Sequence, residues 1–479
     1  MPLDASATVT HTRRTWDDEI QPALVDYIRV PAVSVGFDPG WEAHGHLDTV
    51  VEAAASWARR RPIVGLAVEV VRLPGRTPLL WFEVPATAPA ADTSDTVLLY
   101  GHLDKQPPMT GWREGLGPWD PVVVDDRLYG RGGADDGYAA YASLAAIEAV
   151  QAGGGSHARC VGLIECSEES GSPDLLAYVE HLADRIATPS LVVCLDSFCG
   201  DYERLWTTTS LRGLLDVDLR VDVLTEGVHS GSASGVVPDT FRIVRRLLDR
   251  IEDPDTGRIL LPELWTHLPP GRTAEISAVA DDLGAALTSW YPFVDGARPT
   301  VATSEPAAQL TARTWEPTLT VIGADGLPPT QTAGNVLRPS TTLSLSFRLP
   351  PGVDADAAGA AVVAALTVDP PHGAHVTATV PSAGAGWDAP ATAPWLAAAM
   401  AAASEATFGQ PARSLGEGGS IPFMGMLGER FPAAQYLLTG VLGPASNAHG
   451  PNEFLHLPTG RKVTAAVALV LDAHADRPA

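Results

Sequence analysis

The chain has 479 residues, more than one ordinary domain needs, so we expect two domains with a large buried core. Its formal net charge of −25 opposes binding to a nucleic acid or an anionic membrane, and neither is expected as a partner. The four cysteines show no CxxC spacing and lie in or beside apolar runs, which favours buried thiols over a disulfide framework or a zinc knuckle.

Targeting segments are not evident. The N-terminal segment has no apolar run that could serve as a signal peptide, and no stretch reaches about 18 uninterrupted apolar residues. We therefore expect a soluble cytoplasmic protein.

The N-terminal part of the chain alternates helix and strand patterns. Residues 15–29 and 41–60 have the apolar spacing of amphipathic helices, and residues 66–104 contain three β-rich runs. The linker-like segment 88–95 separates the second run from the third. Helix candidates and apolar strands then alternate as far as residue 197. This alternation predicts a largely parallel sheet with helices on both faces.

Polar clusters follow three of these apolar strands. They lie at residues 101–106, 165–171 and 196–197. Because ligands gather beyond the carboxyl ends of the strands in such sheets, the three clusters predict one shared site.

Beyond residue 210 the pattern changes to a period of two. Residues 214–224, 341–349 and 375–380 alternate apolar and polar side chains, as half-solvated antiparallel strands do. Helix patterns lie at 241–251 and 357–368. The intervening Pro-rich stretch, residues 253 to 330, is interpreted as long connections.

The predicted fold is α/β with a second, inserted α+β domain. Residues 1–210 and 389–479 are expected to form the first domain, with the mostly parallel sheet flanked by helices. Residues 211–388 are expected to form the second domain, with the antiparallel sheet.

The first polar cluster contains His102 and Asp104 at the end of TVLLYGHLD. Residues two apart in an extended chain point to the same side, so one can bind a metal while the other orients it. A metal-bound imidazole usually donates its second N–H to a carboxylate, which is the role expected for Asp104. The alternative is an ordinary polar turn at a strand end.

Two further segments place acidic residues side by side. GRGGADDG holds Asp135 and Asp136, and CSEES holds Glu168 and Glu169 directly after an apolar strand. Adjacent carboxylates repel unless a cation or a proton lies between them. Glu169 can bind a cation while Glu168 acts as general base. The alternatives are a solvated Gly-rich loop and, for CSEES, helix capping by the neighbouring serines.

Asp196 at the end of SLVVCLD and His449 in the polar loop SNAHGPNEF complete the set. The candidates supply two imidazoles and three carboxylates without a thiolate, which suits zinc, manganese or cobalt. If one carboxylate bridges two ions, each ion has three protein ligands and open positions for water and substrate. The predicted metal ligands are His102, Asp135, Glu169, Asp196 and His449.

These segments together resemble the M20 metallopeptidases, and within that family the carnosinase-like and nonspecific dipeptidases. The resemblance spans residues 100 to 460 and rests on seven motifs that occur in the family's order. They are GHLDKQP, RLYGRGGADDG, ECSEESGS, LDS, GVHSG, EGGSIP and NAHGPNE.

The resemblance implies a role for each member of the site. His102 and Asp196 would bind one ion, Glu169 and His449 the other, and Asp135 would bridge them. Glu168 matches the general base and Asp104 the carboxylate that steadies His102. The Asp135–Asp136 bond matches a non-proline cis peptide.

The resemblance also implies a di-zinc exopeptidase fold whose second domain is a lid and dimerisation domain. His229 in GVHSG would act in trans on the partner subunit's site, so a homodimer is expected. Asn335 and Arg348 match substrate-binding positions. The loop residues Gly418, Gly419 and Ser420 match the segment that contacts the substrate backbone. One departure is Gly416, where relatives commonly have arginine, so a substrate or structural contact could differ.

The expected function is hydrolysis of the peptide bond of dipeptides or other short peptides by two divalent metal ions per subunit. Zinc is the first choice, and manganese and cobalt are the alternatives. An N-acyl-amino-acid deacylase or a carboxypeptidase of the same fold is the nearest rival, because it would share the site chemistry. A catalytically silent binding protein is a third possibility, against which the presence of Glu168 beside all the ligands argues.

Overall fold

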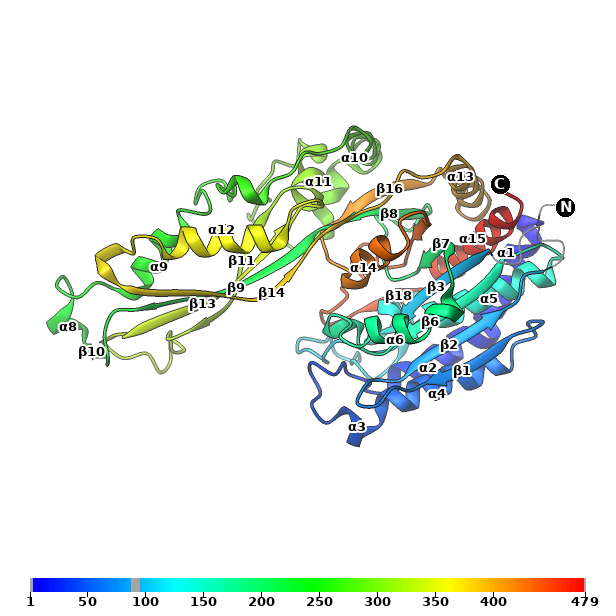
Figure 1. The fold of residues 1–479 in the computed structure, drawn as a ribbon, viewed down its shortest axis with the longest axis horizontal. Coiled ribbons are helices and arrows are strands. Elements are labelled where there is room, and N and C mark those ends of the chain that lie inside the picture. The colour runs from blue at the N-terminus through cyan, green and yellow to red at the C-terminus, as the bar shows by residue number, and fades with distance from the viewer. Residues whose placement is uncertain (1–2, 88–94, 478–479) are drawn as a thin grey trace.

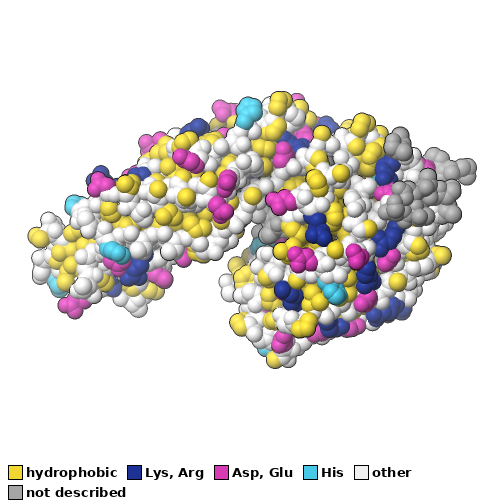
Figure 2. Space-filling model, viewed as in Figure 1, with side chains coloured by type: hydrophobic (Ala, Val, Ile, Leu, Met, Phe, Trp, Pro, Cys, Tyr) yellow, Lys and Arg dark blue, Asp and Glu magenta, His cyan; other side chains and the backbone are white. Residues whose placement is uncertain are grey.

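The computed structural model describes residues 3–87 and 95–477, so the linker-like segment lies almost wholly outside the described residues. Figure 1 shows a broad part, which contains both chain ends, and an arm that projects from it. Viewed from the same side, the molecular surface is hollowed where the arm leaves the broad part (Figure 2).

The broad part is built on a six-stranded sheet in the order β1-β2-β6-β3-β7-β17. Strands β6, β3, β7 and β17 run parallel, whereas β2 is antiparallel to β6 and β1 to β2. This confirms the mostly parallel sheet. The strands are β1 (Ala67–Val71), β2 (Leu79–Val84), β3 (Thr96–His102), β6 (Arg159–Glu165), β7 (Pro189–Cys194) and β17 (Gln435–Leu438).

Helices cover both faces of this sheet because its central strands are apolar on both sides. In β3, Val97 and Leu99 belong to one core and Leu98 and Tyr100 to the opposite core. The first core includes α5 (Ala139–Ala152) and α15 (Leu457–Ala475), and the second includes α6 (Leu175–His181) and α14 (Pro422–Arg430). A parallel strand that is covered on both faces has a continuous run of apolar residues in its sequence, and this is the pattern that was predicted. The four cysteines are buried and form no disulfide.

The N-terminal helix patterns are longer and more divided than predicted. The chain forms α1 (Ala5–Thr15), the π-helical turn η1 (Trp16–Ile20) and α2 (Gln21–Arg29), with the Asp4 side chain capping α1. The pattern at 41–60 gives α3 (Trp41–His44) and α4 (His46–Arg59). The division falls at Gly45, whose φ of 67° no helix interior accepts.

The arm contains a four-stranded antiparallel sheet in the order β11-β13-β9-β14. Burial alternates along β9 and β13, which confirms the period-two pattern. The helices α9 (Thr240–Leu248) and α12 (Ala355–Thr367) pack on its buried face. The strands are β9 (Gly213–Asp222), β11 (Thr318–Asp325), β13 (Ser340–Leu349) and β14 (His375–Gly384).

The interpretation of residues 253 to 330 as long connections was wrong. This stretch contains α10 (Pro270–Leu283), the 3-10 helix η5 (Gly284–Trp290), α11 (Pro306–Thr314) and β11. Both α-helices begin with a proline, which is tolerated there because the first N–H groups of a helix have no partner within it. Prolines that suggested loops therefore mark helix starts.

The helices α10 and α11 pack against a three-stranded sheet in the order β15-β8-β16, and two small sheets contain the other strands of the described residues.

Among the described residues, no helix has the combination of length and apolar character that crossing a bilayer requires. The domain boundaries after residues 210 and 388 stay predictions. The remaining strands are β4 (Val122–Val124), β5 (Arg127–Tyr129), β8 (Trp206–Leu211), β10 (Val228–His229), β12 (Val336–Leu337), β15 (Trp387–Asp388), β16 (Arg413–Glu417) and β18 (Phe454–His456). The remaining helices and turns are η2 (Gly133–Gly137), η3 (Glu168–Ser170), α7 (Ala183–Ile186), α8 (Ser230–Ala233), η4 (Pro262–Leu264), η6 (Pro371–Gly373) and α13 (Pro394–Phe408).

Candidate metal centre

His102 is the last residue of β3, and its side chain is fully buried. Its Nδ1 lies 3.1 Å from the backbone oxygen of Asp104 and 3.5 Å from Asp104 Oδ1. Its Nε2 is buried and makes no hydrogen bond with the described residues. The contact with Asp104 orients the ring and leaves Nε2 available to a metal ion.

Asp135 lies between two imidazoles. Its Oδ1 is 3.6 Å from Nε2 of His102, and its Oδ2 is 3.1 Å from Nε2 of His449. The Asp135–Asp136 peptide bond is cis, as the family resemblance implied. A carboxylate whose two oxygens face two different imidazoles has the arrangement of a ligand shared by two ions.

Each imidazole has a second carboxylate beside it. Asp196 Oδ2 lies 3.8 Å from His102 Nε2, and Glu169 Oε2 lies 3.3 Å from His449 Nε2. The structure therefore brings the five predicted ligands together in two sets that share Asp135. Oxygen and imidazole nitrogen donors at this spacing suit divalent ions such as zinc or manganese.

Glu168 lies at the edge of the same cluster, in η3. Its Oε2 is 3.9 Å from His102 Nε2. The carboxylate of Asp104 accepts hydrogen bonds from the backbone N–H groups of Glu168 at 3.1 Å and of Glu169 at 3.0 Å. Asp104 thus holds both the imidazole and the turn with the two glutamates, so its effect extends further than the sequence suggested.

The cluster holds more buried negative charge than its surroundings neutralise. Burial, together with the nearby Asp196 carboxylate, raises the pKa of Glu168 well above its usual value. Burial and the Asp135 carboxylate do the same to the pKa of Glu169, and burial raises the pKa of Asp196 to about 7. Buried Glu169 Oε1 also has no hydrogen-bond partner among the described residues. Divalent cations would offset this repulsion and supply the missing partners, so the residues fit a metal centre.

The turn that carries Glu168 is braced by Glu165, a residue to which sequence reasoning assigned no role. Its buried carboxylate accepts hydrogen bonds from the hydroxyls of Tyr100 at 2.6 Å, Ser167 at 2.9 Å and Ser172 at 2.8 Å. Ser172 therefore braces this turn, and the start of α6 has no side-chain cap, which rules out the capping alternative for CSEES. The only sequence signal for Glu165 was its place at the start of the second polar cluster.

A buried ion pair between Arg131 and Glu453 was also missed. Nη2 of Arg131 donates to the backbone oxygens of His449 at 3.0 Å and Gly450 at 2.8 Å. Glu453 Oε1 accepts from the N–H of Gly132 at 2.8 Å. The pair thus fastens the His449 loop to the turn that leads into Asp135. Sequence reasoning missed it because the partners are 322 residues apart.

The predicted loop at Gly418, Gly419 and Ser420 follows β16, and its Ser420 lines a cavity of about 880 Å³. Ser420 and Glu169 both line this cavity. Arg348 Nη1 donates to Ser420 Oγ at 3.0 Å, so the structure brings these two predicted residues together.

His229 and Asn335 lie elsewhere. Both are exposed, and the N–H of Ser230 donates to the backbone oxygen of Asn335 at 2.9 Å. Figure 1 places β10, which contains His229, at the end of the arm far from the six-stranded sheet. Within one chain, the structure does not bring these two residues to the metal ligands.

The chain is similar to known proteins in sequence and in fold. Residues 98–473 match the family model described as peptidase family M20/M25/M40. A cysteinylglycine-S-conjugate dipeptidase from Corynebacterium striatum is 29% identical over 425 residues, covering 85% of this chain and 86% of that protein. Solved structures of the dipeptidase Dug1p from Saccharomyces cerevisiae and of human carnosine dipeptidase 1 have the same fold. Their TM-scores are 0.79 and 0.78, each is 20% identical, and the matches cover 100% and 99% of this chain and 100% of each structure.

We predict that Arg131→Lys weakens divalent-cation binding. A lysine keeps a positive charge beside Glu453 but cannot donate to both loop carbonyls from a fixed planar fork. Loss of such a supporting contact typically costs about 10-fold to 100-fold in metal affinity. Titration of the metal-free protein with zinc or manganese would measure the change. Arg185→Lys, which alters an exposed ion pair with Glu69, is the matched control. Equal metal affinity in both variants would show that the Arg131 contacts do not support the site.

Proposed function

Because the chain belongs to peptidase family M20/M25/M40, we propose that it is a metal-dependent dipeptidase that hydrolyses the peptide bond of dipeptides or other short peptides. The observation that carries the proposal is the Asp135 carboxylate, whose two oxygens face His102 and His449. A relative that matches 85% of this chain is named a dipeptidase, which supports the substrate class.

The proposed centre holds two divalent cations per subunit. His102 and Asp196 would hold one, Glu169 and His449 the other, and Asp135 would bridge them. Zinc is the first choice because the donors are imidazoles and carboxylates, and manganese or cobalt are alternatives. When bound, the cations would polarise the substrate carbonyl and lower the pKa of a water molecule, which makes that water nucleophilic at neutral pH.

The chain's own residues then position the substrate and move the proton. Glu168 accepts a proton from the attacking water and delivers it to the amine that leaves. Asp104 keeps His102 oriented and, through two backbone hydrogen bonds, holds Glu168 next to the reacting groups. The raised pKa of Glu168 suits a group that must take up and release a proton in one cycle.

We propose that Arg348 binds the free carboxylate of the peptide. Its guanidinium donates to Ser420, which lines the cavity that Glu169 also lines. A planar fork of N–H donors recognises a carboxylate well. Gly418, Gly419 and Ser420 would contact the substrate backbone, and Asn335 would bind a substrate oxygen.

We further propose a homodimer in which His229 of the partner subunit stabilises the oxyanion. The support is the position of β10, because a single chain leaves His229 exposed and remote from its own metal ligands. A cytoplasmic location is also proposed, supported by four buried cysteines that form no disulfide.

Substrates that differ in length and in whether their amino terminus is free or acylated test the proposed function. The protein loaded with zinc, manganese or cobalt is expected to cleave unblocked dipeptides, and a chelator is expected to abolish that activity because the site loses its cations. The assay compares dipeptides, longer peptides and N-acetyl amino acids at equal enzyme concentration. Cleavage of N-acetyl amino acids but not of dipeptides would favour the deacylase, and preference for longer peptides would favour the carboxypeptidase.

Glu168→Gln is expected to retain metal binding but to lower kcat by about 100-fold to 10,000-fold, because glutamine cannot transfer the proton. Metal content and kcat are measured on the same preparation. Glu180→Gln, which changes an exposed glutamate on α6, serves as the control. Retained turnover in the Glu168 variant would contradict its assignment as the base.

The dimer proposal predicts complementation. His229→Ala and Glu168→Gln should each be nearly inactive, whereas a mixed dimer has one site that combines an intact Glu168 with an intact His229. After random subunit exchange, about a quarter of all sites would be restored. The measurement is the activity of the mixture relative to each variant alone, with mock-exchanged variants as controls. No recovery in verified mixed dimers would contradict action in trans.

A further inference from the structure

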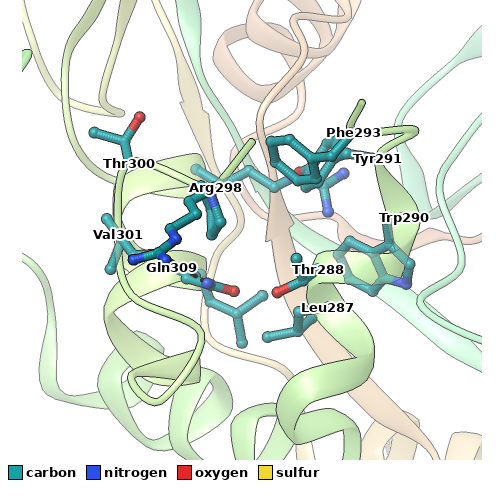
Figure 3. Close-up of a pocket in the computed structure, with 12 residues that line it drawn as sticks. Leu287, Thr288, Trp290, Tyr291, Phe293, Arg298, Thr300, Val301 and Gln309 are labelled. Atoms are coloured by element: carbon teal, nitrogen blue, oxygen red, sulfur yellow. Dashed lines mark hydrogen bonds between the residues drawn. The ribbon is translucent and has the colours of Figure 1, made fainter. Parts of the chain in front are cut away.

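A second cavity lies between η5 and α11, in the stretch 253–330 that the sequence analysis interpreted as long connections. Its volume is about 340 Å³. Figure 3 shows Trp290, Tyr291 and Phe293 on one side of it and Gln309 and Val301 on the other. A space of this size with aromatic walls suits the side chain of a ligand better than solvent alone.

Two polar atoms of residues that line this cavity are buried without a hydrogen-bond partner among the described residues. They are Oγ1 of Thr288 and Nη1 of Arg313. The Gln309 amide nitrogen is occupied, because it donates to the backbone oxygens of Val301 at 2.9 Å and Ala302 at 3.1 Å. In Figure 3 the Thr288 hydroxyl and the Gln309 amide point toward one another across the space. Buried donors without partners are costly, so they indicate a ligand that brings an acceptor.

The charges of the residues that line the cavity also indicate a ligand with a hydrogen-bond acceptor. Arg298 and Arg313 line the cavity, and the described residues that line it include no aspartate or glutamate. The sign of the lining charge is opposite to that of the whole chain, which has 57 acidic and 32 basic residues. The cavity therefore favours a carboxylate and disfavours a basic group.

This cavity lies near the candidate metal centre and the proposed substrate loop. Phe198 follows Asp196 by two residues, and its ring centroid is 5.1 Å from that of Trp290. The guanidinium carbon of Arg313 lies 4.4 Å from the centroid of the Phe198 ring. A Cβ atom added to Gly418, in the proposed substrate loop, would lie 2.9 Å from the backbone oxygen of Arg313. These contacts place the cavity within reach of a side chain of a molecule bound at the metal centre.

We infer that this cavity is a specificity subsite that receives a bulky aromatic or apolar substrate side chain bearing a carboxylate. The inference rests on the proposed function and deepens it by naming the class of side chain. Trp290, Tyr291 and Phe293 contact the apolar part of that side chain. Arg298, Arg313 and Thr288 donate to its carboxylate.

The test uses matched dipeptides in which one residue of Ala-Ala, at either position, is replaced by 4-carboxyphenylalanine or 4-aminomethylphenylalanine. The wild-type protein is expected to show a kcat/KM about 10-fold or more higher for the carboxylate member of at least one pair. In Arg298→Glu the preference should fall below about twofold or reverse, because the exposed arginine becomes a like charge. Thr288→Val should reduce it without a change of charge. For each variant, kcat/KM is expressed relative to its own value for Ala-Ala, so a general loss of activity does not count as a change of preference.

Arg14→Glu, which reverses an exposed arginine on α1, controls for the change in net charge. Binding of the same dipeptides to Glu168→Gln, with and without Arg298→Glu, is measured by calorimetry, so selectivity is read without turnover. Selective binding without hydrolysis of any dipeptide would contradict the proposed function but support the subsite. Absence of a carboxylate preference, or a preference that Arg298→Glu and Thr288→Val leave unchanged, would overturn the subsite.

Discussion

The crowding of buried carboxylates around two imidazoles is the constraint on which the rest of the site depends. Asp135 faces His102 and His449, and Glu168, Glu169 and Asp196 lie within the same small volume. Burial disfavours ionised acids, and each acid disfavours ionisation of the next. Such a cluster is stable in its charged form only when positive charge is brought into it, so the fold and divalent cations are thermodynamically linked.

The surrounding structure holds these groups at their spacing through charges and hydrogen bonds that never touch the proposed ions. Asp104 orients the ring of His102 and binds the backbone of the turn with the glutamates, and Glu165 accepts a hydrogen bond from Ser172 of the same segment. Arg131 donates to the backbone of the His449 loop. Each of these supports is itself buried, where an unpaired charge would be costly. The supports therefore need to form together, which makes the geometry of the ligands insensitive to local fluctuation.

We propose that the arm and the segment from η5 to α11 give the enzyme its substrate selection. The sheet of the arm carries Arg348 toward Ser420 at the large cavity, whereas β10 carries His229 away from the ligands of its own chain. The segment from η5 to α11 adds the aromatic and arginine-lined cavity next to Phe198. The proposed metal ligands lie at the end of β3 and in turns and loops beside the six-stranded sheet, so differences in substrate preference are expected to reside in the elements of the arm.

The sequence by itself determined the mostly parallel sheet and the identities of the five proposed ligands. Apolar runs that end in acids are local patterns, and the carboxyl ends of parallel strands must meet at one edge. Only the tertiary structure decided that Arg131 pairs with Glu453, that Glu165 braces the glutamate turn, and that the Pro-rich stretch folds into helices around a cavity. These features depend on which side chains meet after the chain has folded. The local sequence around a charged residue does not indicate a partner 322 positions away. A proline occurs both in loops and at the first turn of a helix, so it does not distinguish the two.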